Sequence, residues 1–420
     1  MTPARTMCRY IAGSLSYAIT ITANAQCAPV WLPIGSGPVS GISATTLLPN
    51  DNLVVGGTFS VSVSGGVQAS NIAQWDGDEW FAMGTGMGGT VYALTTLATG
   101  DVVAGGSFMT SDGVYTNRIA RWDGSFWHPY IASNGSVGID GTVRAVAALP
   151  SGDLIAGGLF QSAGGTSASN IARWDGTDWQ PLGTGTDGDV RALTVLPSGD
   201  LIAAGTFFDV PARRIARWDG MSWHSLDTGV SGNGIPSAVI ALAVHPSGDL
   251  LAGGVFTSAG TAQANRIARW DGTAWSALGT GFTGSNSSVT AIAVLPSGTI
   301  VAGGINITSG PVQFNQVAQW NGSDWHHMGL GLPFFPWSFS VLSSGDLICT
   351  GAGNPGIARW NYCAECYADC DGDGALDIFD FICFGNEYAD NTPYADCDSN
   401  GFFDIFDHFC FSLAYAIGCS

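Results

Sequence analysis

The sequence predicts a mainly β fold, namely a seven-bladed β-propeller with one blade split between the two ends of the repeat, followed by a small α-helical calcium-loop domain. A Trp-Asp or Trp-Asn turn recurs at intervals of about 40 to 52 residues, and a second Trp follows most of these turns five residues later. A period of this length, built from short apolar strands and glycine turns, is typical of a radial array of β-sheets. The turn tryptophans are Trp75, Trp122, Trp174, Trp218, Trp270, Trp320 and Trp360.

One unit shows the four strands of a blade. Residues 190–196 are dominated by apolar and β-branched side chains and precede a Pro-Ser-Gly-Asp turn. Residues 201–207, 215–218 and 223–226 follow as three more short strands, and an Asp-Gly hairpin turn joins the last two. Residues 30–360 contain no long apolar stripe with a 3.6-residue period, so we expect no helices in the ring.

The repeat begins and ends inside a unit. Residues 31–37 correspond to a lone fourth strand, and residues 357–360 correspond to a lone third strand. If these two strands pair, the ring closes and no sheet edge is left at the seam. We therefore assign the propeller to residues 26–362.

The first 25 residues have the features of a signal peptide. Arg5 and Arg9 precede a modestly apolar stretch, and the Ala-Asn-Ala at residues 23–25 fits a small-x-small cleavage site. We expect cleavage after Ala25 and a secreted protein, free or attached to the cell surface. A disordered N-terminus and lipid attachment at Cys27 are the less favoured alternatives. No other segment is long and apolar enough to span a bilayer.

The charge balance excludes two classes of partner. The formal net charge is −20, and all 13 basic residues are arginines. Nucleic acids and anionic membranes attract proteins through basic patches, which this composition does not favour.

Residues 363–420 carry the clearest chemistry. Two loops, 27 residues apart, place oxygen-bearing side chains at positions 1, 3, 5, 9 and 12, a glycine at position 6 and a backbone oxygen at position 7. This pattern predicts two Ca²⁺ sites; a solvated acidic tail is the alternative, but such tails do not alternate Asp with Ile-Phe pairs. The expected ligands are Asp369, Asp371, Asp373, Ala375, Asp377 and Asp380 in the first loop, and Asp396, Asp398, Asn400, Phe402, Asp404 and Asp407 in the second.

Cysteine placement supports export, because seven of the ten cysteines lie in residues 363–419. In the split blade, Cys27 and Cys363 fall in one turn, so we predict a disulfide between them that closes the propeller. Cys366 and Cys419 would join the ends of the second domain, and Cys349 replaces a small strand residue and should be a buried free thiol. The pairing of Cys370, Cys383, Cys397 and Cys410 stays open, and thiolate metal binding is the alternative.

Both parts of the chain resemble known families. The Ala-Gly-Gly of the second strands (residues 104–106, 156–158 and 252–254), with the aromatic-Asp turn and the later Trp, resembles Kelch-type repeats. The Trp-Asp dipeptide also occurs in WD40 repeats, but the matching Gly-His is missing. A propeller resemblance implies architecture only.

The duplicated calcium loop, each copy followed by an expected helix (residues 381–388 and 408–416), resembles a type I dockerin in a cysteine-rich variant found on exported bacterial proteins. This resemblance implies docking onto a cohesin-like or cell-surface protein. Loop positions 10 and 11 would bind the partner, and core packing of the same side chains is an equally weighted alternative. These positions are Ile378, Phe379, Ile405 and Phe406.

The ring itself carries no catalytic motif, and we assign no catalytic residue. Aspartates in repeated turns are explained by turn capping, both after Ser-Gly (Asp153, Asp200, Asp249) and after Trp (Asp123, Asp175, Asp219). The arginine that recurs in the third strands is expected to be structural. The loops between strands two and three and between strands four and one vary more and share one face, so we expect a glycan or protein ligand there. The candidates are Asp112, Tyr115, Asp140, Asp189, Asp209, Arg213 and Arg214.

The aromatic stretch at residues 332–337 belongs to the same face. It would stack on sugars or peptides, or Phe334 and Phe335 would fill a groove at the closing blade; the second interpretation is slightly favoured.

Two function classes follow. The first is an exported, non-enzymatic binding or structural propeller displayed through a calcium-dependent docking module. The alternative is a carbohydrate-active enzyme that degrades polysaccharide. Acids or histidines outside the repeat in the central funnel would favour the enzyme, whereas a lining of Gly, Ala, Val and Ser would favour the binding ring.

Overall fold

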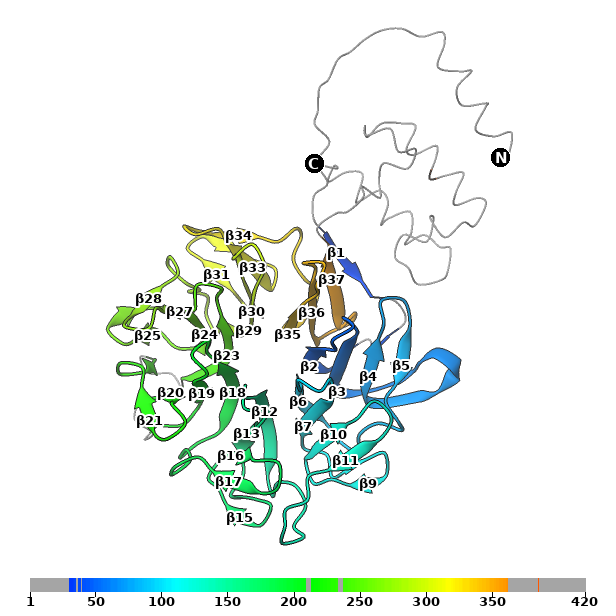
Figure 1. Cartoon of the computed structure of the whole chain (residues 1–420). Coiled ribbons are helices and arrows are strands. Elements are labelled where there is room, and N and C mark those ends of the chain that lie inside the picture. Colours follow the sequence, from blue (N-terminus) through cyan, green and yellow to red (C-terminus); the bar gives the residue numbers. More distant parts are fainter. Residues whose placement is uncertain are drawn as a thin grey trace, which may run out of the picture. The chain divides into compact units, whose positions relative to one another are not determined.

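The computed structural model describes residues 30–34, 37–38, 40–208, 213–232 and 237–361, together with Phe384. Within these residues, seven four-stranded antiparallel sheets stand around a central axis (Figure 1). The innermost strands contact one another in a closed cycle, β2–β6–β12–β18–β23–β29–β35 and back to β2. The described residues therefore form a β-propeller.

Six sheets follow the chain from the inner strand outward. The first three are β2 (Ile42–Leu47), β3 (Leu53–Ser62), β4 (Gln68–Trp75), β5 (Trp80–Ala82); β6 (Val91–Thr96), β7 (Val102–Gly106), β10 (Ile119–Trp122), β11 (Trp127–Pro129); and β12 (Thr142–Ala148), β13 (Leu154–Leu159), β16 (Ile171–Trp174), β17 (Trp179–Pro181). The next three are β18 (Val190–Val195), β19 (Leu201–Gly205), β20 (Ile215–Trp218), β21 (Trp223–Ser225); β23 (Ala238–Val244), β24 (Leu250–Val255), β27 (Ile267–Trp270), β28 (Trp275–Ala277); and β29 (Ser288–Val294), β30 (Ile300–Ile305), β33 (Val317–Trp320), β34 (Trp325–His327).

The closing sheet combines the two ends of the repeat. Its inner three strands are β35 (Phe335–Val341), β36 (Leu347–Ala352) and β37 (Ile357–Asn361), and its outer strand is β1 (Val30–Pro33). Trp31 pairs with Trp360, as Trp75 pairs with Trp80 in the next sheet. The predicted pairing of the lone third and fourth strands is confirmed.

The loops between strands two and three repeat more than the sequence suggested. Four of them carry a short hairpin, so length and sequence vary around a shared local structure. These hairpins are β8 (Thr110–Ser111) with β9 (Val114–Tyr115), β14 (Ser162–Ala163) with β15 (Thr166–Ser167), β25 (Ser258–Ala259) with β26 (Ala262–Gln263), and β31 (Thr308–Ser309) with β32 (Val312–Gln313). β22 (Val230–Ser231) adds to the third of them, and in the first unit the extended β3 and β4 meet at the turn η1 (Ser64–Gly66).

The core lies between neighbouring sheets. Val54 and Ile72 of one sheet pack with Val91 and Phe108 of the next, and equivalent layers recur around the ring. In four units the second Trp also ties neighbours together, because its indole N–H donates to a backbone oxygen of the preceding unit. The Trp127 Nε1 to Met83 O distance, for example, is 3.0 Å. Apolar burial and these hydrogen bonds together fix the spacing of the sheets.

The arginine that recurs in five of the third strands is structural, as predicted. Arg217 Nη1 lies 2.6 Å from Asp200 Oδ2, and the same ion pair joins Arg121 to Asp101, Arg173 to Asp153, Arg269 to Asp249 and Arg359 to Asp346. Turn capping is therefore the wrong explanation for the carboxylates of Asp200 and Asp249, which bind the arginine of the third strand. Asp153 does both, because its Oδ2 also accepts a hydrogen bond from Ser151 Oγ of its own turn at 3.0 Å. Turn capping is confirmed for the predicted aspartates that follow a turn Trp, namely Asp123, Asp175 and Asp219. Asp123 Oδ1, for example, accepts backbone hydrogen bonds from Ser125 and Phe126, each at 2.8 Å.

Cys349 is a buried free thiol in β36, as predicted, and burial raises its pKa. Among the described residues, no helix has the length and apolar character to cross a membrane. Several predictions lie outside the described residues: the signal peptide, the seam disulfide, both calcium loops, the remaining cysteines, Ile378, Phe379, Ile405 and Phe406.

Candidate functional site at the mouth of the central channel

Every inner strand carries a β-bulge at the same place. In β12 the pairing register shifts between Val143 and Ala145, so Arg144 is left over opposite β13. The same shift occurs in the other six sheets. Bulges bend a strand and redirect the extra side chain, and they are common beside binding sites.

A glycine opposite each bulge explains why the bulge forms. A Cβ added to Gly158 would lie 2.0 Å from the Thr142 carbonyl oxygen and 3.0 Å from the Arg144 amide nitrogen. The backbone before the bulge therefore occupies the space of a missing side chain. All seven sheets have glycine here: Gly57, Gly106, Gly158, Gly205, Gly254, Gly304 and Gly351.

The bulged residue changes from unit to unit, although its neighbours repeat. The preceding residue is buried Val, Ile or Pro, and the following residue is Ala or Ser. The bulged residues are Ser43, Tyr92, Arg144, Arg191, Ile240, Thr290 and Trp337. A fixed frame thus presents seven unlike side chains in a ring.

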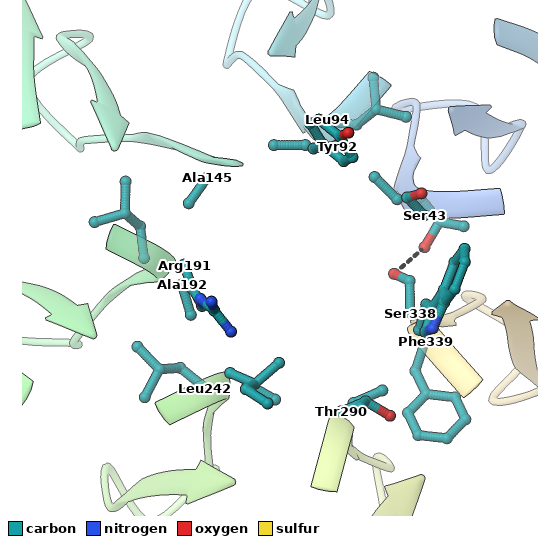
Figure 2. Close-up of a pocket in the computed structure, with 18 of the residues that line it drawn as sticks. Ser43, Tyr92, Leu94, Ala145, Arg191, Ala192, Leu242, Thr290, Ser338 and Phe339 are labelled. Carbon is teal, nitrogen blue, oxygen red and sulfur yellow. Dashed lines mark hydrogen bonds between the residues drawn. The ribbon is translucent and has the colours of Figure 1, made fainter. Parts of the chain in front are cut away.

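This ring surrounds the opening of a cavity of about 320 Å³. All of its members except Arg144 line the cavity, together with the Ala or Ser and the larger residue that follow each bulge. Figure 2 shows Arg191 directed into the opening, with Tyr92, Ser43 and Thr290 on surrounding strands. Each inner strand begins after a loop that joins strand four of one unit to strand one of the next, so the bulges lie near the face that carries these loops. The mostly apolar residues that follow the bulges line the deeper part of the cavity.

Two arginines and one aspartate form the charged side of the mouth. Arg144 Nε lies 2.9 Å from Asp189 Oδ2, and Arg191 Nε donates a hydrogen bond to the same oxygen at 3.3 Å. The Arg144 guanidinium also lies over the Tyr92 ring, 5.5 Å from its centroid, a cation–π contact. The side chain of Asp189 is held between the two arginines, and the residue is only 8% exposed.

These two arginines differ from most of the others in the ring. Five arginines make the third-strand ion pairs. Three more, Arg118, Arg214 and Arg266, donate to a backbone oxygen in the next unit, as Arg214 Nε does to Ser237 O at 2.7 Å. Arg144 and Arg191 take neither repeated role, and their terminal nitrogens make no hydrogen bond with the described residues.

The aromatic stretch divides between core and cavity. Phe334 is 2% exposed and packs in the core beside the closing sheet, so its predicted filling role is confirmed. Phe335 is 43% exposed and is the first residue of the inner strand β35. The prediction that it fills a groove is therefore wrong. Trp337, 40% exposed, lines the cavity.

The other predicted ligand-binding residues do not gather at one place. Asp112 accepts a hydrogen bond from the Thr85 amide, which lowers its pKa. Burial opposes ionisation of Asp140, but hydrogen bonds from Ser162 and Gln161 keep its pKa below the ordinary value. Both aspartates therefore hold loops in place.

The remaining candidates lie in separate places. Arg214 donates a hydrogen bond to Ser237 O of the next unit. The Arg213 guanidinium lies over the Phe208 ring, 4.8 Å from its centroid, and Tyr115 is exposed on β9. Asp209 lies outside the described residues. Of the seven predicted positions, Asp189 is the one that the structure places at the mouth.

Sequence reasoning missed Tyr92, Arg144 and Arg191 because they lie on strands rather than in loops. Aligning the inner strands on their Val-x-Ala pattern shows that, within these three residues, the middle one varies most, and this alignment is the sequence signal that finds the site. Within the described residues, no group of three or more His, Cys, Asp or Glu is placed to hold a metal ion.

Comparison with known proteins supports the fold. No family model and no curated protein matches the chain. Among solved structures, a catalytically inactive virginiamycin B lyase from Staphylococcus aureus with quinupristin aligns with 80% of this chain and 100% of its own, at 13% identity and a TM-score of 0.54. The WD40 β-propeller domain of Doa1 aligns with 80% of this chain and 98% of its own, at 14% identity and a TM-score of 0.50.

The extracellular domain of a putative one-component system from B. thetaiotaomicron aligns with 83% of this chain, at 11% identity and a TM-score of 0.51. This chain covers only 42% of that structure. Identities this low show the fold alone, and each of these likenesses supports a β-propeller.

Proposed function

We propose that the protein is an exported, non-enzymatic binding propeller whose ligand enters the mouth of the central channel. The observation that carries this proposal is the ring of bulged residues, because the residues on either side of each bulge repeat while the bulged side chain itself changes widely from unit to unit. Packing alone would not require Tyr, Arg and Trp to replace one another there. Side chains that differ around an opening are what recognition of one particular ligand requires.

The cavity chemistry favours binding over hydrolysis. Polysaccharide hydrolases use a pair of carboxyl groups about 5–10 Å apart. The described residues that line the cavity include no Asp, Glu or His. Asp189, which borders it, is engaged by two arginines and is therefore a poor proton donor or nucleophile.

We further propose that the seven sheets form the seven blades of a Kelch-like ring, that residues 1–25 direct export, and that residues 363–420 are a dockerin-like module. In this proposal Ca²⁺ bound at two sites orders that module, which then docks onto a cohesin-like or cell-surface protein. The duplicated loop pattern in the sequence supports this part.

The secreted full-length protein should be screened against panels of glycans and peptides, with release of product measured in parallel. A ligand found in this way should bind about tenfold more weakly to Trp337→Ala, since burying a large apolar side chain contributes on the order of 1.5–3 kcal/mol. Phe126→Ala is the matched control, because Phe126 is 64% exposed in the β10–β11 turn on the opposite face.

A ligand that binds Trp337→Ala and wild type equally, while Phe126→Ala weakens it, would move the site to the other face. Steady product release at a rate proportional to protein concentration would replace the binding proposal with an enzymatic one.

A further inference from the structure

We propose that the mouth binds a neutral glycan chain through one terminal uronic acid, with the carboxylate on Arg144 and Arg191 and the sugar ring against Trp337. This proposal rests on the proposed function, because it names the ligand class of the same site.

The two arginines supply the recognition of a carboxylate. Their Nε atoms face Asp189 at 2.9 and 3.3 Å, so the outer edges of both guanidinium groups, each with two terminal nitrogens, are left for another partner. Guanidinium forks bind carboxylates through paired, charge-assisted hydrogen bonds. Two positive charges against one negative charge leave the mouth with a local excess of one positive charge.

Asp189 fixes the direction of these forks. It is 8% exposed, and its Oδ1 atom is buried without a hydrogen-bond donor from the described residues. Such an acceptor is costly to bury, which indicates a carboxylate kept for positioning rather than for stability. Arg144 is held from its other side by the Tyr92 ring. The positive groups are therefore arranged before the ligand arrives.

The rest of the ring favours a sugar over a peptide as the bearer of the carboxylate. Trp337 presents an exposed aromatic surface, and sugars stack their C–H faces on such rings. Hydroxyl groups also belong to the lining: Ser43 is a bulged residue, and Thr45 and Ser338 share a hydrogen bond of 2.9 Å. The Thr290 hydroxyl donates to the Pro336 carbonyl oxygen, which leaves its own oxygen as an acceptor. Hydroxyls act as both donors and acceptors, as sugar hydroxyls require.

Size and overall charge restrict the ligand further. A cavity of about 320 Å³ is at the small end of ligand pockets, which suits the end of a chain rather than its middle. The formal net charge of the chain is −20, so a densely charged polyuronate would be repelled beyond the mouth. A single terminal acid on a neutral stem avoids that repulsion.

The test uses the secreted full-length protein and isothermal titration calorimetry. The probes are a neutral oligosaccharide capped by one glucuronic acid, its carboxyl-reduced counterpart, polygalacturonate, and a peptide with a free C-terminal carboxylate. We expect the capped oligosaccharide to bind most tightly, and its reduced form to bind about tenfold more weakly or worse, as loss of a charged hydrogen bond predicts. Arg191→Gln should remove this difference between the two probes, and Arg191→Lys should restore part of it.

Arg213→Gln is the matched control, because Arg213 is exposed and contacts Phe208; it should bind as wild type does. Equal affinity for the acid and its reduced form, or unchanged acid binding by a folded Arg191→Gln protein, would overturn the uronate proposal. If the peptide binds most tightly, the proposal that a sugar carries the carboxylate is wrong. If polygalacturonate binds most tightly, the proposal of a single terminal acid is wrong. If a ligand binds and neither Arg191→Gln nor Trp337→Ala weakens it, the proposed site itself is wrong.

Discussion

The glycine pair opposite the bulge gives the sharpest prediction, because its two members face different obstacles. A Cβ added to Gly157 would lie 2.6 Å from Cγ1 of Val190, the residue before Arg191. A Cβ added to Gly158 would lie 2.0 Å from the Thr142 carbonyl oxygen. A side chain can move away from a new methyl group, whereas a paired backbone cannot. Consistent with this, Ala204 stands at the place of Gly157 in another sheet, while the place of Gly158 is always glycine.

Gly157→Ala should therefore destabilise the ring by about 1–3 kcal/mol, the usual range for overpacking. At about 2 °C per kcal/mol for a domain of this size, its melting temperature should fall by about 2–6 °C. Gly158→Ala should cost more than about 3 kcal/mol and should also weaken ligand binding, because the bulge that presents Arg144 cannot form.

Circular dichroism melts of the purified protein measure both effects. The reciprocal change Ala204→Gly is the control and should cost only about 0.5–1 kcal/mol, the usual penalty of glycine in a strand. If Gly158→Ala melts like wild type, or if Gly157→Ala is the more damaging change, the account of the bulge is wrong.

Three further predictions follow. In calorimetry of the full-length protein, a chelator should remove a separate unfolding transition of residues 363–420 and leave the transition of the ring. Free Ca²⁺ at 100 times its dissociation constant would stabilise the folded C-terminal domain by about 2.7 kcal/mol. An unchanged trace would argue against calcium loops. Because Val30 pairs with Asn361, non-reducing peptide mapping should find Cys27 joined to Cys363, a link worth about 5 kcal/mol in the chain-entropy model, and Cys27 found free would contradict the seam. The Phe126 amide, the His128 side chain and the Ser125 amide bind the Asp123 carboxylate and lower its pKa from 3.8 to about 2, so its contribution to stability is complete above about pH 4 and is lost as the pH falls towards 2. Asp123→Asn should make the melting temperature less dependent on pH in that window, because Asn321 accepts the same backbone hydrogen bonds in another unit; an unchanged pH dependence would show that this carboxylate is not responsible.

Much of the ring could be predicted because its determinants are local and repeat. The pairing of Trp31 with Trp360, the structural role of the third-strand arginines and the burial of Cys349 all follow from aligning one unit with another. The prediction for residues 201–207 extends past the end of β19 at Gly205, where the strand meets its loop.

The ring of bulged residues could not be predicted by aligning units, because a bulge depends on how two strands pair. Within one strand, Arg144 and Arg191 look like ordinary alternating positions. The Ala-Gly-Gly pattern was visible as a family feature, but its physical meaning, a backbone displaced towards a missing side chain at Gly158, depends on the register with the inner strand. The calcium loops and their partner-binding residues remain predictions from sequence.

The pairing of Val30 with Asn361 also fixes where the chain enters and leaves the ring. Third strands run away from the face where inner strands begin, so Asn361 lies at the face opposite the bulged residues. The described chain therefore both enters the ring, at Val30, and leaves it, at Asn361, on the face opposite the channel mouth. Neither end of the described ring thus lies beside the bulged residues that we propose bind the ligand.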